Sequence, residues 1–319
     1  MKIGDLRLGK IDGKHEYLEP STTEEQFAFD SFLIPQNIDV SQLDNRQKMF
    51  VEGFRGTGKT SLLRWHAEQM RRNAHRTEFV LFKTELTEEQ KLQISKEAGI
   101  SWTDINSSKM EISQDFKSVW SWFILHKIGE IMQQNTTQYS EKSDFLDRFF
   151  AILGLDQEGI FQKVLGFLPR IEGASIKIKS KIDFFEAELT GDFQRDTGGG
   201  KTTLEALNRK AFDHLRKINF KKKIYLYFDE LEVFYHNPEQ YKRDQRMTRD
   251  LLFCVYKYND LFRKEKIPIF IVAAVRSEII DSMGSIGQEI DRVVHDHGLL
   301  ISWHHAKKSL SHPLFEMIA

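Results

Sequence analysis

The feature that most constrains this chain is a glycine-rich segment of eight residues, Gly53–Thr60, with the sequence GFRGTGKT. The segment matches the pattern G-x-x-x-x-G-K-[ST] at every fixed position. A short apolar run, Met49–Glu52, precedes it, and a stretch of helical composition, SLLRWHAEQMRR, follows it. A strand that leads through such a loop into a helix is the opening unit of a parallel α/β sheet. The segment therefore predicts an α/β fold.

Each fixed residue of this loop suits the binding of a polyphosphate. The glycines let the backbone bend so that several N–H groups point into one concavity, and the positive end of the following helix faces the same place. Lys59 supplies a charge for the β- and γ-phosphates, and the Thr60 hydroxyl is a ligand for Mg²⁺. We therefore predict a site for ATP and Mg²⁺ made by Gly53, Phe54, Arg55, Gly56, Thr57, Gly58, Lys59, Thr60 and Ser61.

A second apolar run, 223–228, predicts a strand that ends in two acids, Asp229 and Glu230. A carboxylate at the carboxyl edge of the neighbouring strand can hold Mg²⁺ through water, and this role suits Asp229. Glu230 is then placed to polarise the attacking water as a general base. Acidic strand ends are common in α/β proteins, so the pair gains its meaning from the glycine-rich loop upstream.

Two further positions carry arginine candidates. Arg276 and Ser277 follow the apolar run 268–275, which predicts a strand buried on both faces. Arg276 is placed to stabilise charge on the γ-phosphate and Ser277 to position the water, with a surface salt bridge as the alternative for Arg276. Arg292 is a candidate arginine finger acting on a neighbouring subunit. Its competitors are Arg243, Arg246 and Arg249.

A second G-K-T sequence, GGGKTT at Gly198–Thr203, is interpreted differently. The position five before Gly200 is Arg195, and no apolar strand precedes the segment, so the context of a phosphate loop is missing. Thr202 and Glu205 have the spacing of a capping box. We predict that this sequence begins a helix.

The composition is that of an ordinary globular protein, with 40% apolar and 29% charged residues and a net charge of −1 over 319 residues. This balance does not indicate nucleic acid, although a local basic face would suffice for DNA. The single cysteine, Cys254, lies in an apolar helical run and is expected to be an inert core thiol. Four histidines near the end have no cysteine partners, so no zinc site is expected at His295, His297, His304 and His305.

The chain has no run approaching the ~18 apolar residues of a membrane span. Its start, MKIGDLRLGKIDGKHEY, lacks the apolar core of a signal peptide. We therefore expect a soluble cytoplasmic protein with no membrane partner.

The middle of the chain changes in pattern. Apolar residues fall at helical spacing over 116–132 and 145–168, and 175–179 alternates like a strand or hairpin arm. The predicted fold is a P-loop NTPase with a mainly parallel five-stranded sheet flanked by helices. Its parts are a lead-in at 1–45, a core at 46–84 and 204–304, a mainly helical insertion at 85–203 and a C-terminal segment at 305–319.

The order of loop, helical insertion, acid-ended strand and arginine-ended strand resembles the AAA+ and STAND group of ATPases, including origin-recognition-like proteins. A closer resemblance is to a poorly characterised family of bacterial P-loop ATPases, and it covers most of the chain. The matching passages are Leu8–Asp12 with Glu16, Arg276-Ser277-Glu278, Trp303 and His312-Pro313-Leu314. Several related ATPases are components of bacterial defence against phage, which the resemblance implies as a role here.

One departure from the AAA+ pattern concerns the end of the chain. AAA+ proteins usually follow the last sheet strand with a helical lid that carries a second arginine, whereas this sequence stops at Ala319. The resemblance then implies either a missing lid or a truncated chain, and slow hydrolysis. We expect an ATPase that drives a conformational or assembly switch, as a homo-oligomer or with an effector protein.

Three other functions fit parts of the sequence. The first is a sensor or scaffold that holds ATP without hydrolysing it, and the second is a DNA-associated AAA+ motor or loader. The third is a small-molecule kinase, which the adjacent acids Asp229 and Glu230 disfavour because they suit water as the acceptor.

Overall fold

The computed structural model describes residues 32–34, 38–85, 87–89, 91–92, 116–134, 140–155, 171–172, 175–176, 204–231, 238–283 and 288–303. The chain divides into two compact units. The described residues of the first come from Met1–Phe82, Ile224–Glu232 and Ile269–Ala319, and those of the second from Lys83–Lys223 and Val233–Pro268. The predicted core included 204–223 and 233–268, which belong to the second unit in the structure.

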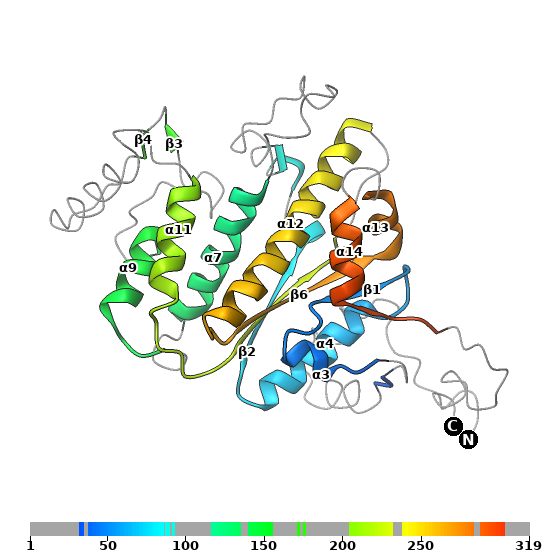
Figure 1. Ribbon diagram of the computed structural model, residues 1–319, viewed down its shortest axis with the longest axis horizontal. Helices are drawn as coiled ribbons and strands as arrows, with labels where there is room; N and C mark the ends of the chain where they lie inside the picture. Colours follow the sequence, from blue (N-terminus) through cyan, green and yellow to red (C-terminus); the bar gives the residue numbers. More distant parts are fainter. Residues whose placement is uncertain are drawn as a thin grey trace. The chain divides into compact units, whose positions relative to one another are not determined.

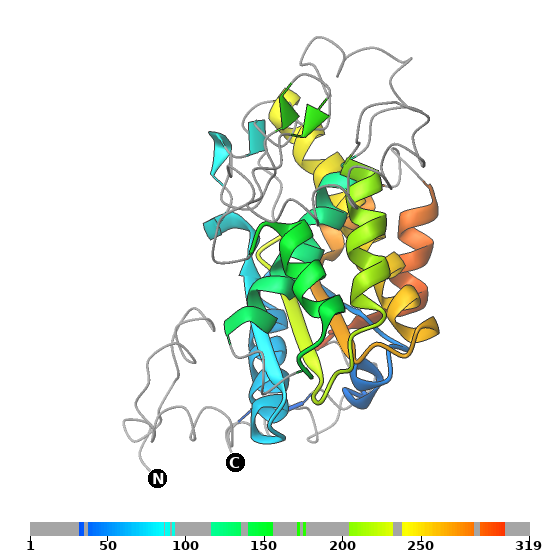
Figure 2. The same ribbon diagram turned by 90° about the vertical axis from the view of Figure 1, so that its left-hand side faces the viewer.

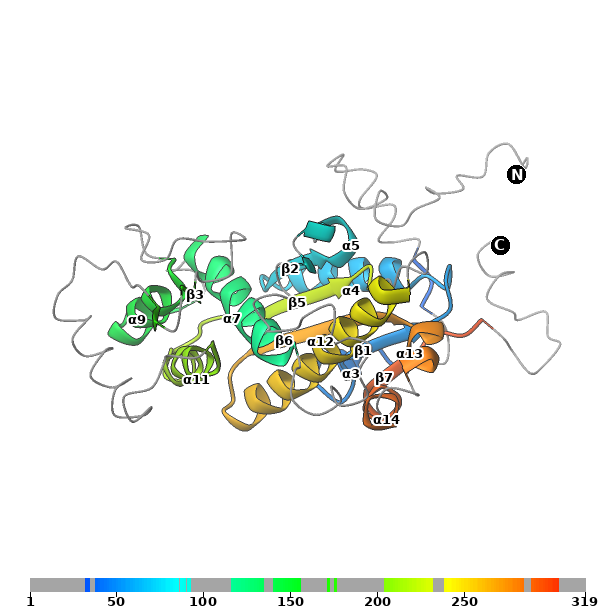
Figure 3. The same cartoon turned by 90° about the horizontal axis from the view of Figure 1, so that it is seen from above.

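The first unit is built on a five-stranded sheet in which all neighbouring strands are parallel. Its strands are β1 (Phe50–Gly53), β2 (Arg76–Leu81), β5 (Ile224–Asp229), β6 (Ile269–Arg276) and β7 (Gly298–Leu300). They lie in the order β2-β5-β6-β1-β7, so that β6 separates β1 from β5 (Figure 3). The predicted α/β class with five parallel strands is confirmed.

The central strand β6 and its neighbours β5 and β1 are the most deeply buried strands of the sheet, and every residue of β1 is buried. Every residue of β5 is buried, and in β6 only the last residue, Arg276, is partly exposed. Continuous apolar runs of this kind suit a strand covered on both faces. Burial of each large aliphatic side chain contributes about 1.5–3 kcal/mol to the stability of the fold. These strands therefore hold the residues at their carboxyl ends in defined positions.

Helix α4 (Lys59–Arg72) covers one face of this sheet and carries the residues that follow the glycine-rich loop (Figure 3). His66 joins it to β5, because its Nδ1 lies 2.8 Å from Tyr227 Oη. The other ring nitrogen lies 3.1 Å from the carboxylate of Asp44 in α3 (Ser41–Asp44). Apolar side chains complete the contact, namely Leu62, Leu63, Ala67 and Met70 of α4 with Val51, Tyr225, Tyr227, Val272 and Ala274 of the sheet.

The described part of the second unit is mainly helical, with α7 (Lys117–Gln134), α9 (Asp144–Leu153), α11 (Leu204–Leu215) and α12 (Pro238–Lys264). Helices α7, α9 and α11 pack side by side (Figures 1 and 2). The Ser143 side chain caps α9 by accepting from the Leu146 N–H, and Gly154 ends it in a left-handed conformation. The short helix α5 (Phe82–Glu85) begins where the first unit ends.

Several elements differ from their predicted bounds. A hairpin of β3 (Ile171–Glu172) and β4 (Ser175–Ile176) stands where a strand or hairpin arm was expected. The sequence analysis does not predict α13 (Ser277–Met283), which continues directly from β6, and helix α14 (Gln288–His297) leads into β7. The GGGKTT segment and the segments 1–31 and 305–319 lie outside the described residues.

Candidate functional site

The glycine-rich segment forms a tight loop between the end of β1 and the start of α4. Gly56 and Gly58 have φ angles of 81° and 90°, values that cost a residue with a Cβ atom about 1–2 kcal/mol. The N–H and hydroxyl of Thr57 both donate to the Phe54 carbonyl, at 3.3 and 2.9 Å. Gly58 stands at the N-cap of α4 and offers no side chain to its first N–H groups. The positive end of this helix therefore opens into the loop.

The first glycine of the loop is required by close packing. A Cβ atom on Gly53 would lie 2.6 Å from Thr57 Oγ1 and 3.0 Å from the Ile301 carbonyl oxygen. The backbone at Ile301 cannot retreat easily, because its N–H donates to the Glu52 carbonyl at 2.8 Å. The loop thus approaches its neighbours as closely as only glycine allows.

The Lys59 side chain folds back over the loop. Its Nζ donates to the carbonyl oxygens of Gly53 and Phe54, at 2.8 and 2.7 Å. Burial lowers the pKa of Lys59, as does the nearby charge of Arg276, whereas the carboxylates of Glu278 and Asp229 oppose the shift. The loop lysine therefore lies in a shared electrostatic environment with the ends of β5 and β6.

Asp229 ends β5 as a buried carboxylate with 4% exposure. Burial raises its pKa, while hydrogen bonds from the Glu230 N–H and the Thr60 hydroxyl oppose the shift. The Glu230 N–H donates to Oδ1 at 2.8 Å, and Oδ2 has no hydrogen-bond partner among the described residues. The structure thus brings Asp229 to Thr60. The expectation that Asp229 ends the strand next to β1 is wrong, because β6 lies between them.

Glu230 follows the strand in a strained backbone conformation. Its φ is 59°, in the left-handed region that non-glycine residues rarely occupy. Such residues cost about 1–3 kcal/mol and cluster at active sites and ligand clamps. Arg46, Ala74 and Lys266 adopt the same conformation elsewhere in the described residues.

The end of β6 lies directly beside the loop. Arg276 pairs in register with Gly53, and Ser277 begins α13 with its buried hydroxyl lacking a partner among the described residues. Glu278 accepts from the backbone N–H of Arg55 at 3.4 Å. A carboxylate therefore faces an amide of the loop that was predicted to bind phosphate.

The chain has no match among protein-family models, curated proteins or solved structures. Within the part that the structure describes, no helix combines the length and apolar character needed to span a bilayer. Its function is therefore inferred from the chemistry of its own residues.

Two side chains at the loop were not predicted as site residues. The Trp303 indole N–H donates to the Thr57 carbonyl at 3.0 Å, which ties the segment after β7 to the loop. Arg64, one turn after Thr60 on α4, is buried to 7% exposure near Asp229 and Glu230. Sequence spacing places Arg64 on the same helix face as Thr60, but nothing in the sequence shows which strand end that face meets.

The candidate arginine finger, Arg292, lies apart from these contacts. Its side chain on α14 is 85% exposed and lies 3.6 Å from the Asp296 carboxylate. Among its competitors, Arg249 pairs with Asp250 at 2.8 Å, and Arg243 is buried to 1% exposure. Exposure leaves Arg292 accessible to another subunit, and burial makes Arg243 a poor finger.

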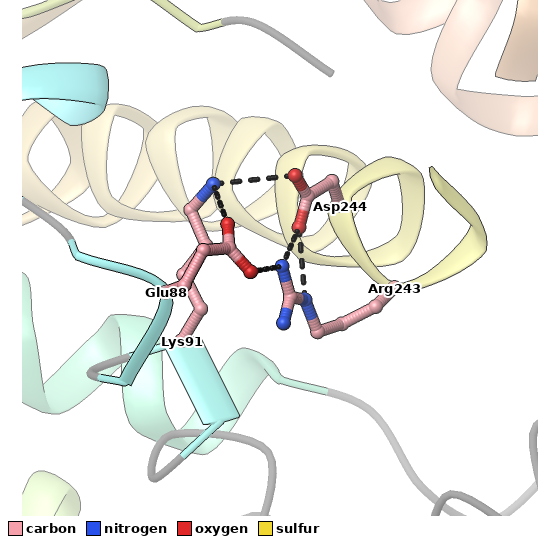
Figure 4. Close-up of polar contacts among 4 residues, drawn as sticks. All are labelled: Glu88, Lys91, Arg243 and Asp244. Atoms are coloured by element: carbon pink, nitrogen blue, oxygen red, sulfur yellow. Dashed lines mark hydrogen bonds and ion pairs between the residues drawn. The ribbon is translucent and has the colours of Figure 1, made fainter. Parts of the chain in front are cut away.

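Arg243 belongs to a charge cluster in the second unit with Lys91, Asp244 and Glu88 (Figure 4). Glu88 is exposed, and the other three residues are buried. Its Nη2 lies 2.7 Å from both Glu88 Oε2 and Asp244 Oδ1. Lys91 Nζ lies 3.2 Å from Asp244 and 3.3 Å from Glu88. Burial raises the pKa of Glu88, but the bonds and charges of Arg243 and Lys91 outweigh it and leave the pKa below its usual value. The cluster joins residues 88–91 to α12.

The remaining chemical candidates show no catalytic arrangement in the described residues. Cys254 is buried, and its thiol donates to the Lys117 carbonyl at 3.4 Å beside a cavity of about 310 Å³ with mostly apolar walls. His295 is an exposed residue 3.8 Å from Glu52, and His304 and His305 lie outside the described residues. No group of three potential metal-binding side chains occurs in the described part.

Proposed function

We propose that this chain binds Mg-ATP at the loop of residues 53–60, hydrolyses it, and uses the cycle to switch its conformation or assembly. One observation carries the proposal. At the carboxyl edge of a parallel sheet, the charge of Asp229 acts on the ammonium group of Lys59, and the Thr60 hydroxyl donates to the Asp229 carboxylate. The buried Oδ2 of Asp229 has no hydrogen-bond partner among the described residues. Ligands of open α/β sheets bind at this edge.

The loop supports a polyphosphate ligand. Two left-handed glycines and the open N-terminus of the 14-residue helix α4 present N–H groups and a positive dipole end. The two Lys59 bonds to loop carbonyls have a charged donor and are worth about 1.5–3 kcal/mol each. A phosphate, in which the acceptor is charged as well, forms a stronger bond and can draw the ammonium group away from the loop carbonyls. The preference for adenine follows the resemblance to AAA+ and STAND ATPases.

The acid end of β5 fits a magnesium ion. Mg²⁺ is held in nucleotide sites by one or two protein oxygens, by waters and by substrate phosphates, and the Thr60 hydroxyl and Asp229 carboxylate are oxygens of this kind. A buried carboxylate with an unpartnered oxygen is costly on its own. A bound cation would offset that cost and neutralise charge on the phosphates.

Hydrolysis needs a base and a counter-charge near the γ-phosphate. Glu230, fixed in its strained conformation next to Asp229, is the proposed base that takes the proton of the attacking water. Arg276, in register with Gly53, is the proposed positive group. The buried Ser277 hydroxyl has no hydrogen-bond partner among the described residues, and we propose that it orients the water. The water oxygen then bonds to phosphorus as the bond to the ADP oxygen breaks.

The biological setting rests on the resemblance. We propose a homo-oligomer or an effector complex, with Arg292 as a finger from the neighbouring subunit and bacterial anti-phage defence as the process. A scaffold that retains ATP without turnover, and an ATPase on DNA, are the alternatives. Turnover, retention of nucleotide and salt-dependent DNA binding separate the three.

The test is a titration of ATP, ADP and GTP with and without Mg²⁺, combined with phosphate release and size measurement. Lys59→Ala removes the loop ammonium, and the matched control is Lys264→Ala, whose side chain is 66% exposed at the end of α12. We expect the first variant to lose at least about tenfold in ATP affinity, since a charged hydrogen bond is worth about 1.5–3 kcal/mol, and the control to bind normally. Wild-type protein that binds no nucleotide would overturn the proposal.

A further inference from the structure

Arg64 occupies an unusual place for an arginine. It lies on α4 one turn after Thr60, with 7% exposure, and its guanidinium carbon lies 3.6 Å above the centre of the Phe79 ring. A ring face attracts a cation and fixes the plane of the guanidinium. The side chain is therefore held in one orientation within the first unit.

The ring beneath Arg64 relates it to the acid end of β5. Phe79 of β2 pairs with Tyr227 of β5, and the two rings stack with centroids 4.8 Å apart. Two residues further along the same ladder, Leu81 pairs with Asp229. The guanidinium thus lies on the α4 side of the sheet, just before the position where β5 delivers its two acids.

The polar atoms of these groups are incompletely bonded. Arg64 Nε and Asp229 Oδ2 are both buried, and neither has a hydrogen-bond partner among the described residues. Burial lowers the pKa of Arg64, while the charges of Asp229 and Glu230 oppose the shift. A side chain that served only to fill space on Phe79 would be better replaced by an apolar one, because a buried unpaired N–H is costly.

We propose that Arg64 is a positioning residue of the nucleotide site, whose guanidinium, fixed on Phe79, places a positive charge beside the Asp229–Glu230 pair at the end of β5. This inference rests on the proposed function. This charge favours ionised carboxylates at both positions, so that Asp229 can meet the hydrated cation and Glu230 can accept the proton of the water. Groups that orient metal-binding side chains in this way typically account for about 10–100-fold in metal affinity or activity.

The test uses Arg64→Gln, Arg64→Lys and Phe79→Leu. The matched control is Arg72→Gln, on the same helix, whose side chain is 39% exposed and pairs with Glu68. Each variant is assayed for kcat, for ATP affinity with and without Mg²⁺, and for melting temperature. We expect Arg64→Gln to lower kcat about 10–100-fold and to lose most of the affinity that Mg²⁺ adds, with the Mg²⁺-free affinity within about threefold of wild type.

Arg64→Lys should recover part of the lost kcat because it keeps the positive charge. The recovery should be incomplete because an ammonium group lacks the planar fork of the guanidinium. Phe79→Leu should lower kcat several-fold by releasing the guanidinium, and Arg72→Gln should behave as wild type. Folded Arg64→Gln with wild-type kcat and a wild-type gain from Mg²⁺ would overturn the assignment. If Arg64→Gln does not fold, wild-type kcat and a wild-type gain from Mg²⁺ in both Arg64→Lys and Phe79→Leu would overturn the assignment.

The two proposals fail in distinguishable ways. Wild-type protein that binds no nucleotide overturns the proposed function and this assignment together. If the wild-type protein binds Mg-ATP without turnover, only the proposed hydrolysis is overturned. The gain in ATP affinity from Mg²⁺, compared between wild type and Arg64→Gln, then still decides the role of Arg64.

Discussion

The candidate nucleotide site of the first unit and the charge cluster of the second differ in how their charged groups are paired. In the cluster of Glu88, Lys91, Arg243 and Asp244, each side chain has oppositely charged partners within 3.3 Å. At the site, buried polar atoms lack partners in the described residues, namely Arg64 Nε, Asp229 Oδ2 and Ser277 Oγ. Each such atom costs about 1–3 kcal/mol. Opposite charges compensate one another in the cluster, and at the candidate site we propose that a bound ligand supplies the missing partners.

Burial raises the pKa of Glu88 and of Asp229, but the net shifts of the two carboxyl groups have opposite directions. The pKa of Glu88 lies below its usual value because Arg243 and Lys91 outweigh burial, whereas the pKa of Asp229 is raised because burial outweighs its hydrogen bonds. Folding therefore favours the ionised form of Glu88 and disfavours the ionised form of Asp229. This contrast makes the two regions separable by experiment.

The largest expected effect is on catalysis by Glu230. Glu230→Gln should lower kcat for ATP hydrolysis by about 10²–10⁴-fold, because an amide cannot accept the water proton. ATP affinity and melting temperature should change little, because Glu230 is partly exposed and glutamine has nearly the same size and shape as glutamate. Phosphate release, nucleotide titration and thermal unfolding measure the three, with Glu265→Gln in the exposed turn after α12 as control. Full activity in Glu230→Gln would remove its role as base.

The next effect separates the regions by stability. Asp244→Asn should destabilise the protein by about 3–5 kcal/mol in urea unfolding, because it leaves Lys91 and Arg243 buried without a full counter-charge. Asp229→Asn should be neutral or stabilising by up to ~1 kcal/mol without nucleotide, yet lose the affinity that Mg²⁺ adds. Equal losses of stability in both variants would break the contrast between the cluster and the site.

The pH dependence sharpens this pair. A carboxyl whose folded pKa is raised costs stability once pH rises above the unfolded value near 3.8 and through the folded value. The stability advantage of Asp229→Asn over wild type should therefore be present at pH 7 and shrink as pH falls below the folded pKa. Unfolding at a series of pH values measures it. An advantage that does not depend on pH would show that the substitution acts through packing.

The sequence predicted the form of the loop better than its surroundings. The strand before it, the helix after it and the bends at Gly56 and Gly58 are found in the structure, because the pattern of residue types reflects the backbone it must form. The runs at 223–228 and 268–275 predicted buried strands, because continuous apolar residues suit only a doubly covered strand. These inferences depend on local chemistry, which a single sequence carries.

The contacts between distant residues could not be predicted from the sequence, because they depend on the order of the strands and on how the helices pack. The apolar runs do not say that β6 lies between β1 and β5, and so they misplaced Asp229 on the strand next to the loop. Arg64 and Trp303 acquire their contacts only when α4 and the segment after β7 are set against the sheet. The charge cluster joins residues more than 150 apart, such as Glu88 and Arg243, and has no local signal.

A smaller effect concerns the carboxylate that faces the loop. Glu278→Gln should raise the affinity for ATP about three- to tenfold, because Glu278 accepts the Arg55 N–H and repels an incoming phosphate. Titration at low and high salt measures it, and high salt should reduce the gain. Glu265→Gln again serves as control. Weaker binding by Glu278→Gln would mean that the carboxylate assists the site.

The smallest expected effect tests whether the segment after β7 supports the loop. Trp303→Phe keeps the ring and removes the N–H that donates to the Thr57 carbonyl, a bond worth about 0.5–1.5 kcal/mol. ATP affinity should fall about two- to tenfold, since the loop must then be ordered on binding. The matched control is Trp65→Phe on α4, whose ring stacks on Phe32. Nucleotide should change tryptophan emission in wild type and in Trp65→Phe but much less in Trp303→Phe. An unchanged response in Trp303→Phe would show that ATP binds without disturbing Thr57, and that the bond serves only to attach the segment.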